Sequence, residues 1–427
     1  MYIREITSSE IGEKYYEINH PTGLKIFVLP KKEYKSAYAI FGTKYGSIDT
    51  CFRKKGDEQF TKVPEGIAHF LEHKLFESEE LDAFARYAKT GASANAYTSF
   101  DKTCYLFSCT DNFEQSLEIL LDFVQHPYFT KETVEKEQGI IGQEIRMYDD
   151  VASWMVLFKL LRALYHNHPV RIDIAGTVES ISQINDELLY KCYNTFYNPA
   201  NMALCIAGNV DVEKIVELCD KLLIEHEQSE IERSFEQEPR DIVENKVVYN
   251  LSVPLPVFAL GFKEKCETPE RSLKEIIETN ILLDVIAGKE SPLYKELFKN
   301  GLINTSFSSE YFVGYGFESI IFDGESHDPE KVADAIKNEI KRLRRDGIDE
   351  ELFEAVRRKQ YGKEIMAYND VDDIANAMIS SYFYGFGLFD SIEIYKNVKL
   401  DDIEKRLDVL MDEKYSALSV VRSKEEK

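Results

Sequence analysis

Apolar and polar residues alternate in several short runs, and this period of two predicts β-strands. Two such runs, "LKIFVLP" at 24–30 and "SAYAIFGT" at 36–43, lie near the start. Longer alternating stretches at 92–110 and 303–324 predict strand pairs, and charged helical patterns at 130–148 and 350–368 follow them. Strand runs interleaved with helix runs predict an α+β fold in which a mostly antiparallel sheet carries helices on one face.

The two halves of the chain repeat this order. "GQEIRMYDD" at 142–150 aligns with "GKEIMAYND" at 362–370 at an offset of 220 residues, with Gly, Glu, Ile, Tyr and the last Asp identical. Between the copies, 224–246 is strongly charged and contains Pro239, which is typical of a linker. We therefore predict two duplicated half-domains, 1–223 and 247–427, joined by a charged linker over 224–246.

Composition narrows the possible partners and compartment. The chain has 427 residues and a formal net charge of -24, which disfavours nucleic acid and anionic membranes as partners. Its seven cysteines form no CxxC pair, so reduced thiols are expected. The first residues lack the apolar core of a signal peptide, and the uncharged stretch 247–262 is too short to span a bilayer. We expect a cytoplasmic protein with no membrane partner.

The stretch "GIAHFLEHKLFE" at 66–77 carries the first candidate chemistry. Apolar residues at helical spacing predict a helix over 64–77, with Pro64 in its first turn. On that helix His69 and His73 are neighbours on one face, and Glu72 lies beside them.

Two histidines and a carboxylate in this order suit a zinc hydrolase, which needs three protein ligands, an open position for water and a nearby base. HxxEH supplies two ligands and the base, in the inverted form of the HExxH motif. The alternative is a pair of helix-face histidines bonded to backbone or solvent. The motif favours the metal site.

A third ligand is expected from the predicted helix 130–148. Glu137 and Glu144 lie seven residues apart there, two helical turns along one face. Either could bind zinc while the other orients a ligand. Because glutamates at this spacing are also common on solvated helix faces, the residues alone leave the assignment open.

Several stretches together resemble the insulinase/pitrilysin (M16) family of zinc peptidases, which includes the mitochondrial processing peptidase. They occur in order along nearly the whole chain: "GIAHFLEH", "GASANAYTSFDKTCYLFS", "EKEQGIIGQE", "HPVRIDIAGTVESI", "YNPANMALCIAGNVD" and "SPLYKELFKNGLI". The resemblance implies the family's metallohydrolase fold in two related halves. The sequence is most similar to bacterial members of this family that occur in pairs, in which one subunit has an intact zinc motif and the other does not.

The resemblance also implies a role for each site residue. The positions matching the zinc ligands are His69, His73 and Glu144, with one zinc ion per chain. Glu72 matches the general base, and Glu137 matches the second carboxylate of the catalytic site. Asn95 and Ala96 match the edge strand that holds the substrate backbone by strand addition.

The second half has one histidine, His327, so it cannot repeat the two-histidine site. Family members whose second unit grips substrate carry an Arg there, followed by a Tyr. Phe317 and Glu318 stand at the Arg position in this chain, and neither Arg nor Tyr occurs from 316 to 330. The resemblance therefore implies a related second subunit, in a heterodimer or a homodimer, that completes the site.

We thus expect a zinc endopeptidase subunit that hydrolyses peptides or unfolded segments in an enclosed chamber. The rival hypothesis is a non-proteolytic assembly or modification factor that uses the same fold to hold a protein partner. The presence of Glu72 favours the enzyme, because a purely structural metal site needs no base.

Overall fold

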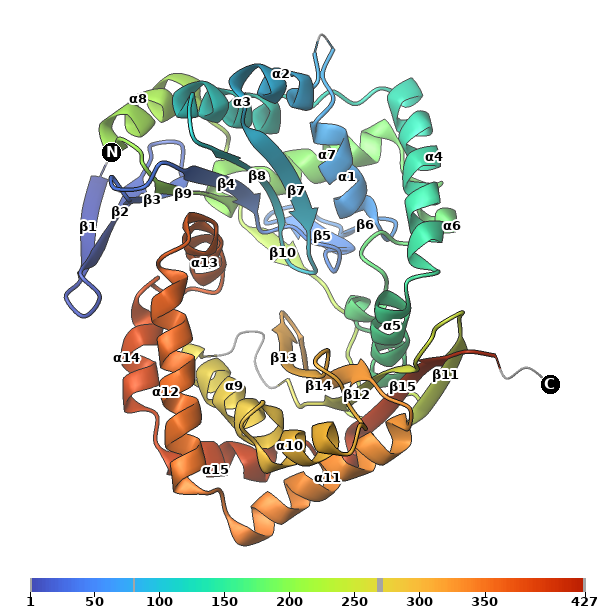
Figure 1. Ribbon diagram of the computed structural model, residues 1–427. Helices are drawn as coiled ribbons and strands as arrows, with labels where there is room; N and C mark the ends of the chain where they lie inside the picture. The colour runs from blue at the N-terminus through green and yellow to red at the C-terminus, as the bar shows by residue number, and fades with distance from the viewer. Residues whose placement is uncertain (1, 80, 267–271, 425–427) are drawn as a thin grey trace. The chain divides into compact units, whose positions relative to one another are not determined.

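A seven-stranded sheet organises the part of the protein that carries the predicted site (Figure 1). Only β3 and β9 pair in parallel, and every other neighbouring pair is antiparallel. In spatial order the strands are β1 (Tyr2–Ser8), β2 (Glu13–Asn19), β3 (Lys25–Pro30), β9 (Met202–Gly208), β4 (Ala37–Thr43), β8 (Thr103–Cys109) and β7 (Ser93–Thr98). The predicted strands at 24–30, 36–43 and 92–110 are confirmed.

The computed structural model describes residues 2–79, 81–266 and 272–424. The chain divides into two compact units that interleave in sequence. Unit 1 comprises 1–145, 173–235 and 365–389, and unit 2 comprises 146–172, 236–364 and 390–427. The division at 223 and 247 is a prediction about the duplicated halves of the sequence, whereas these units are defined by packing.

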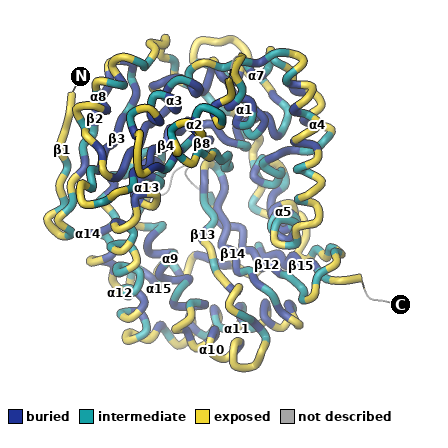
Figure 2. The backbone as a smooth tube through the Cα atoms, turned by 45° about the horizontal axis from the view of Figure 1, so that its top comes forward, coloured by how far each residue is buried: buried dark blue, intermediate teal, exposed yellow. Residues whose placement is uncertain are grey.

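The central strands of unit 1 are covered on both faces. Every residue of β4 and β9 is buried, whereas the edge strand β1 is largely exposed (Figure 2). Helices of the first half, including α1 (Ile67–Leu75) and α3 (Phe113–Gln125), pack against β4, β7 and β8. One helix of the second half, α13 (Val371–Phe383), packs against β4 and β9.

Unit 2 contains a five-stranded sheet with the same kind of cover. Its strands in spatial order are β11 (Lys246–Asn250), β15 (Ser416–Arg422), β12 (Val257–Lys263), β14 (Phe317–Glu325) and β13 (Ser308–Gly314). Only β11 and β15 pair in parallel. The predicted strand pair at 303–324 corresponds to β13 and β14. The helix α5 (Ala152–Leu164), from the first half of the sequence, packs on β12 and β15.

The two halves thus exchange one helix each, and a glycine allows close contact at both crossings. A Cβ atom on Gly42 of β4 would lie 2.5 Å from Ile379 Cδ1 of α13. A Cβ atom on Gly261 of β12 would lie 2.9 Å from Leu160 Cδ2 and Leu164 Cδ1 of α5. Since a backbone without Cβ lets another element approach closely, these glycines fit the helices onto the sheets.

Two long helices follow the predicted pattern closely. They are α4 (Lys131–Tyr148) and α12 (Glu350–Ala367), predicted over 130–148 and 350–368. The chain passes from unit 1 to unit 2 after Ile145 within α4, and from unit 2 to unit 1 after Glu364 within α12. Both of these unit boundaries fall inside a copy of the repeated nine-residue sequence, 142–150 or 362–370.

The remaining helices complete the two units. Those of unit 1 are α2 (Ala83–Thr90), α6 (Val178–Ile181), α7 (Asp186–Phe196) and α8 (Val212–Leu222). Those of unit 2 are α9 (Leu273–Ala287), α10 (Pro292–Lys299), α11 (Pro329–Asp346), α14 (Asp390–Asn397) and α15 (Leu400–Val409). A small sheet in unit 1 pairs β5 (Cys51–Lys54) with β6 (Thr61–Lys62) and β10 (Ile231–Arg233). None of the helices in the described ranges has both the length and the apolar character that a bilayer crossing requires.

Candidate metal centre

The helix α1 carries the HxxEH sequence and is anchored by its apolar face. Its apolar residues Ile67, Phe70, Leu71 and Leu75 are buried. The helix begins at Ile67, three residues later than the predicted start at Pro64, because Gly66 adopts a left-handed conformation with φ 86°. A Cβ atom on Gly66 would lie 2.3 Å from Ala175 O, so this turn requires glycine.

The residues predicted as metal ligands come together. One ligand atom from each of His69, His73 and Glu144 lies within 4.8 Å of the others, the single such group of metal-binding side chains found in the described residues. Nε2 of His69 is 3.8 Å from Glu144 Oε1, and Nε2 of His73 is 3.6 Å from Glu144 Oε2. The histidines come from α1 and the glutamate from α4.

These distances fit a tetrahedral zinc site. Two ligands bound at about 2.0–2.2 Å to one tetrahedral ion lie about 3.4 Å apart, and the two histidine–glutamate separations of 3.8 and 3.6 Å exceed this value only slightly. Two imidazole nitrogens and one carboxylate oxygen also leave the fourth position open, as catalytic zinc sites do. The donor set and its spacing therefore fit a catalytic zinc ion.

Glu137 occupies a different place from Glu144. It is 6% exposed, and His73 Nδ1 donates a hydrogen bond of 3.0 Å to its Oε1. This hydrogen bond places the imidazole proton on Nδ1 and leaves the Nε2 lone pair directed to the Glu144 side. A carboxylate behind a ligating histidine fixes the ring and increases its basicity. The structure thus separates the two carboxylates that sequence reasoning left as alternatives.

Burial gives the two histidines different protonation behaviour. It lowers the pKa of His69 to about 3, with a smaller contribution from His73, so His69 is neutral and able to ligate. Burial also opposes the charged form of His73, but the hydrogen bond to Glu137 and the nearby carboxylates outweigh it and raise the pKa of His73. A cluster of carboxylates that attracts a proton attracts a metal cation for the same electrostatic reason.

Glu72 lies next to this group on α1 and is held by a residue that sequence reasoning missed. Its side chain is buried, and Thr98 Oγ1 donates to Glu72 Oε2 at 2.6 Å. Burial raises the pKa of Glu72, and the hydrogen bond from Thr98 partly offsets that effect. Thr98 is the last residue of β7. The alternation of side chains along this strand is the one sequence pattern that indicates which face of the sheet Thr98 lies on.

Asn95 and Ala96 lie on the same strand as Thr98. β7 is the last strand of the unit 1 sheet, so the predicted edge position is observed. The Ala96 backbone N–H donates to Asn95 Oδ1 at 2.9 Å. The helix α1 packs against β7, which positions this edge next to the helix that carries the histidines (Figure 1).

Comparisons with known proteins agree on one family. Residues 56–178 match the family described as "Insulinase (Peptidase family M16)", and 183–360 match the "Peptidase M16 inactive domain". The chain is 42% identical over 407 residues to the "Uncharacterized zinc protease YmfH" of Bacillus subtilis, covering 94% of this chain and 95% of that protein. The chain belongs to the insulinase (M16) family.

Other relatives support the same assignment. The mitochondrial-processing peptidase subunit beta of Caenorhabditis elegans is 34% identical over 164 residues, 36% of this chain and 35% of that protein. The crystal structure of an M16-like peptidase from Alicyclobacillus acidocaldarius has a TM-score of 0.94 at 37% identity, covering 98% of this chain and 100% of that one. A Helicobacter pylori protease shares the fold, with a TM-score of 0.83, 20% identity and coverage of 96% and 99%.

In this M16 protein, the described residues of the second half contain no counterpart of the group formed by His69, His73 and Glu144. Glu364, the repeat partner of Glu144, accepts a hydrogen bond from Ser391 Oγ. Where α12 faces α9, Lys359 Nζ lies 2.6 Å from Asp284 Oδ2, and Gln360 Nε2 donates to the same oxygen at 2.9 Å. An ammonium group therefore neutralises the carboxylate at this helix pair.

The residues at the expected substrate-gripping position of the second half are buried. Phe317 and Glu318 are 3% and 2% exposed, and Tyr311 Oη donates to Glu318 Oε1 at 2.6 Å. His168, which directly precedes Pro169, is also buried, and caps the short 3-10 helix Pro169–Arg171. Its Nδ1 accepts from Val170 N–H at 3.1 Å, and its Nε2 lies 3.1 Å from Tyr315 O.

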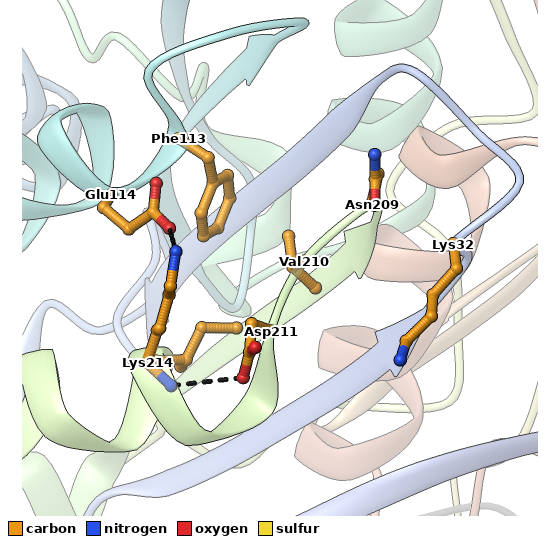
Figure 3. A pocket seen from close by; sticks show the side chains of 8 residues that line it. Lys32, Phe113, Glu114, Asn209, Val210, Asp211 and Lys214 are labelled. Atoms are coloured by element: carbon orange, nitrogen blue, oxygen red, sulfur yellow. Dashed lines mark hydrogen bonds and ion pairs between the residues drawn. The ribbon is translucent and has the colours of Figure 1, made fainter.

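A pocket of about 290 Å³ elsewhere in unit 1 is lined by residues at the first turns of α3 and α8 (Figure 3). Lys214 Nζ bonds Glu114 Oε1 at 2.9 Å across it, and Asp211 caps α8 by accepting from the backbone of Glu213 and Lys214. These contacts pair the charges of Lys214 and Glu114 and provide an acceptor for the backbone N–H groups in the first turn of α8.

Proposed function

We propose that this chain is the zinc-bearing subunit of a metal-dependent endopeptidase, with one zinc ion held by His69, His73 and Glu144. The observation that carries the proposal is the convergence of these ligand atoms within 4.8 Å, with the buried Glu72 carboxylate beside them. Membership of the M16 family and the zinc protease names of its relatives support the metal assignment.

A zinc ion in this position supplies Lewis acidity toward a scissile carbonyl and toward water. Glu72 Oε1 accepts a proton from the attacking water while its Oε2 stays bonded to Thr98. The water oxygen bonds to the carbonyl carbon, the C–N bond breaks, and Glu72 returns the proton to the leaving amine. Glu137 keeps the His73 ring in its ligating orientation through the bond to Nδ1.

The free edge of β7 offers the place for the substrate. An extended peptide can add to an edge strand through main-chain hydrogen bonds, and Asn95 and Ala96 lie on the strand that packs against α1. Strand addition requires an unfolded segment, so the proposed substrates are peptides or unfolded stretches of protein.

We further propose that a related M16 subunit completes the enzyme. The side chains of the buried Phe317 and the ionised Glu318 offer no hydrogen-bond donors for a developing oxyanion, and a carboxylate repels one. The chain also aligns with only 46% of pitrilysin, a fold relative with a TM-score of 0.74 at 16% identity. A second subunit of similar size would supply the missing units and enclose the chamber.

The test is cleavage of an unstructured, internally quenched peptide by the purified chain, alone and with its candidate partner. We expect weak activity alone, strong activity with the partner, and loss of both on chelation with recovery on adding zinc. Activity that survives complete removal of metal would refute the metallopeptidase. Full activity of a monodisperse monomer would refute the partner. Stable partner binding without any cleavage would favour the assembly or modification factor.

A further inference from the structure

Thr98 joins the edge strand β7 to the carboxylate of Glu72, and neither the sequence resemblance nor the relatives' names assign it a role. We propose that Thr98 is a positioning residue that fixes the orientation of Glu72, so that one short strand both holds the peptide and sets the base. The inference rests on the proposed peptidase function and names a further residue that the reaction needs.

The direction of the hydrogen bond follows from counting hydrogens. Thr98 Oγ1 lies 2.6 Å from Glu72 Oε2 and 3.4 Å from Thr103 Oγ1. Thr103 donates its hydroxyl hydrogen to Tyr45 O at 2.8 Å. Since each hydroxyl carries one hydrogen, Thr98 donates to Glu72, and the distance is in the range of charge-assisted O–H···O⁻ bonds.

Glu72 depends on this bond for its orientation. Within the described residues, Thr98 is the one hydrogen-bonding partner of the Glu72 carboxylate. Glutamate has several rotatable side-chain bonds, so holding it in one orientation costs conformational entropy that a hydrogen bond must offset. With Oε2 held by Thr98, Oε1 keeps a constant position from which it can accept a proton.

The strand geometry makes Thr98 suited to this task. Successive side chains of a strand point to opposite faces, so Ala94, Ala96 and Thr98 share one face. Ala94 and Ala96 pack against the core that includes residues of α1, which identifies this face as the one toward Glu72. Ala96 and Thr98 are two residues apart, about 7 Å along the strand. A peptide paired with the β7 edge therefore acquires a fixed register relative to Glu72.

The variants Thr98→Val and Thr98→Ser test the proposal, because valine keeps the shape and serine keeps the hydroxyl. Thr195→Val is the matched control: Thr195 is 1% exposed in α7 and donates to Lys191 O at 2.8 Å, a buried hydroxyl away from the site. In the active assembly we expect Thr98→Val to lower kcat about 10- to 100-fold, the usual effect of removing an orienting partner. KM and zinc content should stay at the wild-type values, Thr98→Ser should recover most of kcat, and Thr195→Val should leave kcat unchanged.

A second measurement does not depend on activity. Crystal structures of the wild type and both variants should show Glu72 in one orientation when residue 98 carries a hydroxyl, and in another or several orientations in Thr98→Val. An unchanged Glu72 in Thr98→Val, an unchanged kcat, or a loss of zinc that accounts for the lost activity would each overturn the proposal. If the wild-type assembly cleaves no peptide, the proposed function fails, and the Glu72 orientations still decide the role of Thr98.

Discussion

Two glutamates of one helix should respond differently when each is converted to glutamine. Glu144 faces Nε2 of both histidines at 3.6 and 3.8 Å, whereas Glu137 bonds Nδ1 of His73 at 3.0 Å on the other side of the ring. We predict that Glu144→Gln loses most of the bound zinc. Glu137→Gln should keep most of it and lose activity instead.

The expected magnitudes follow from these positions. A residue that orients a metal ligand typically contributes about 10- to 100-fold to affinity or activity, which corresponds to about 1.4–2.8 kcal/mol. Glutamine at 137 can still accept a hydrogen bond from His73 Nδ1 through its amide oxygen, so we expect its effect on zinc affinity near the lower end. Glutamine at 144 removes the one charged ligand, so its loss of affinity should exceed this range.

The assay is titration of zinc into the metal-free protein against a competing chromophoric chelator, followed by peptide cleavage at saturating zinc. Glu364→Gln is the matched control, because Glu364 is the repeat partner of Glu144 and bonds Ser391 instead of histidines. It should leave zinc affinity unchanged. Equal weakening of zinc binding in Glu137→Gln and Glu144→Gln would refute the assignment of one ligand and one orienting carboxylate.

Three further predictions concern the base, the packing and the pH dependence. Glu72→Gln should retain zinc and lose cleavage by about a hundredfold or more, and near wild-type turnover would refute its role as base. Gly261→Ala should destabilise unit 2 by about 1–3 kcal/mol in urea unfolding, because the added Cβ would lie 2.9 Å from two leucines of α5. The control Gly362→Ala adds a Cβ to α12 with no atom outside its own helix within 4 Å, so it should leave the stability unchanged or increase it. Burial lowers the pKa of His168 from 6.5 to about 4. As the pH falls, the histidine is therefore protonated in the unfolded chain before it is protonated in the folded chain, and the free energy of unfolding should decrease between pH 6.5 and pH 4. The loss is on the order of 3 kcal/mol, and His168→Gln should have a shallower dependence in this window; an equal slope would contradict it.

Local periodicity is sufficient to predict the helix that carries His69 and His73. The spacing of His69 and His73 puts both rings on one face of any helix, and the apolar residues between them require that helix to be buried on the other side. The start of α1 could not be predicted as well, because the left-handed turn at Gly66 is enforced by the carbonyl of Ala175, a residue distant in sequence. Local patterns specify the type of element, and tertiary contacts specify its ends.

The roles of Glu137 and Glu144 were undetermined by spacing for a similar reason. Both lie on one face of α4, and an imidazole ring has two nitrogens about 2 Å apart on different edges. Which carboxylate faces which nitrogen depends on the angle and height at which α4 passes α1, and this is a property of packing. Thr98 was missed because strand alternation gives the face of a residue, but not the helix residue opposite it.

The exchange of α5 and α13 has the same origin. Each helix has an apolar face that predicts burial, but an amphipathic helix carries no information about which of two apolar sheets it covers. The sequence indicates the exchange only indirectly, through Gly42 and Gly261 in the strands that the exchanged helices contact. Glycine within a strand indicates a close approach without identifying the approaching element.

The two halves differ in the positive charge that lies beside the carboxylates at their helix junctions. In unit 1 the junction of α1 with α4 gathers two histidines and the carboxylates of Glu137 and Glu144, and no lysine or arginine ion pair with either carboxylate occurs in the described residues. At the junction of α9 with α12, Lys359 supplies the positive charge to Asp284. Since buried or half-buried carboxylates require a compensating cation, we predict that a metal ion from solution compensates the first junction, whereas Lys359 of the chain compensates the second. On the proposed function, duplication therefore preserves the fold in both halves and confines metal-dependent chemistry to the first.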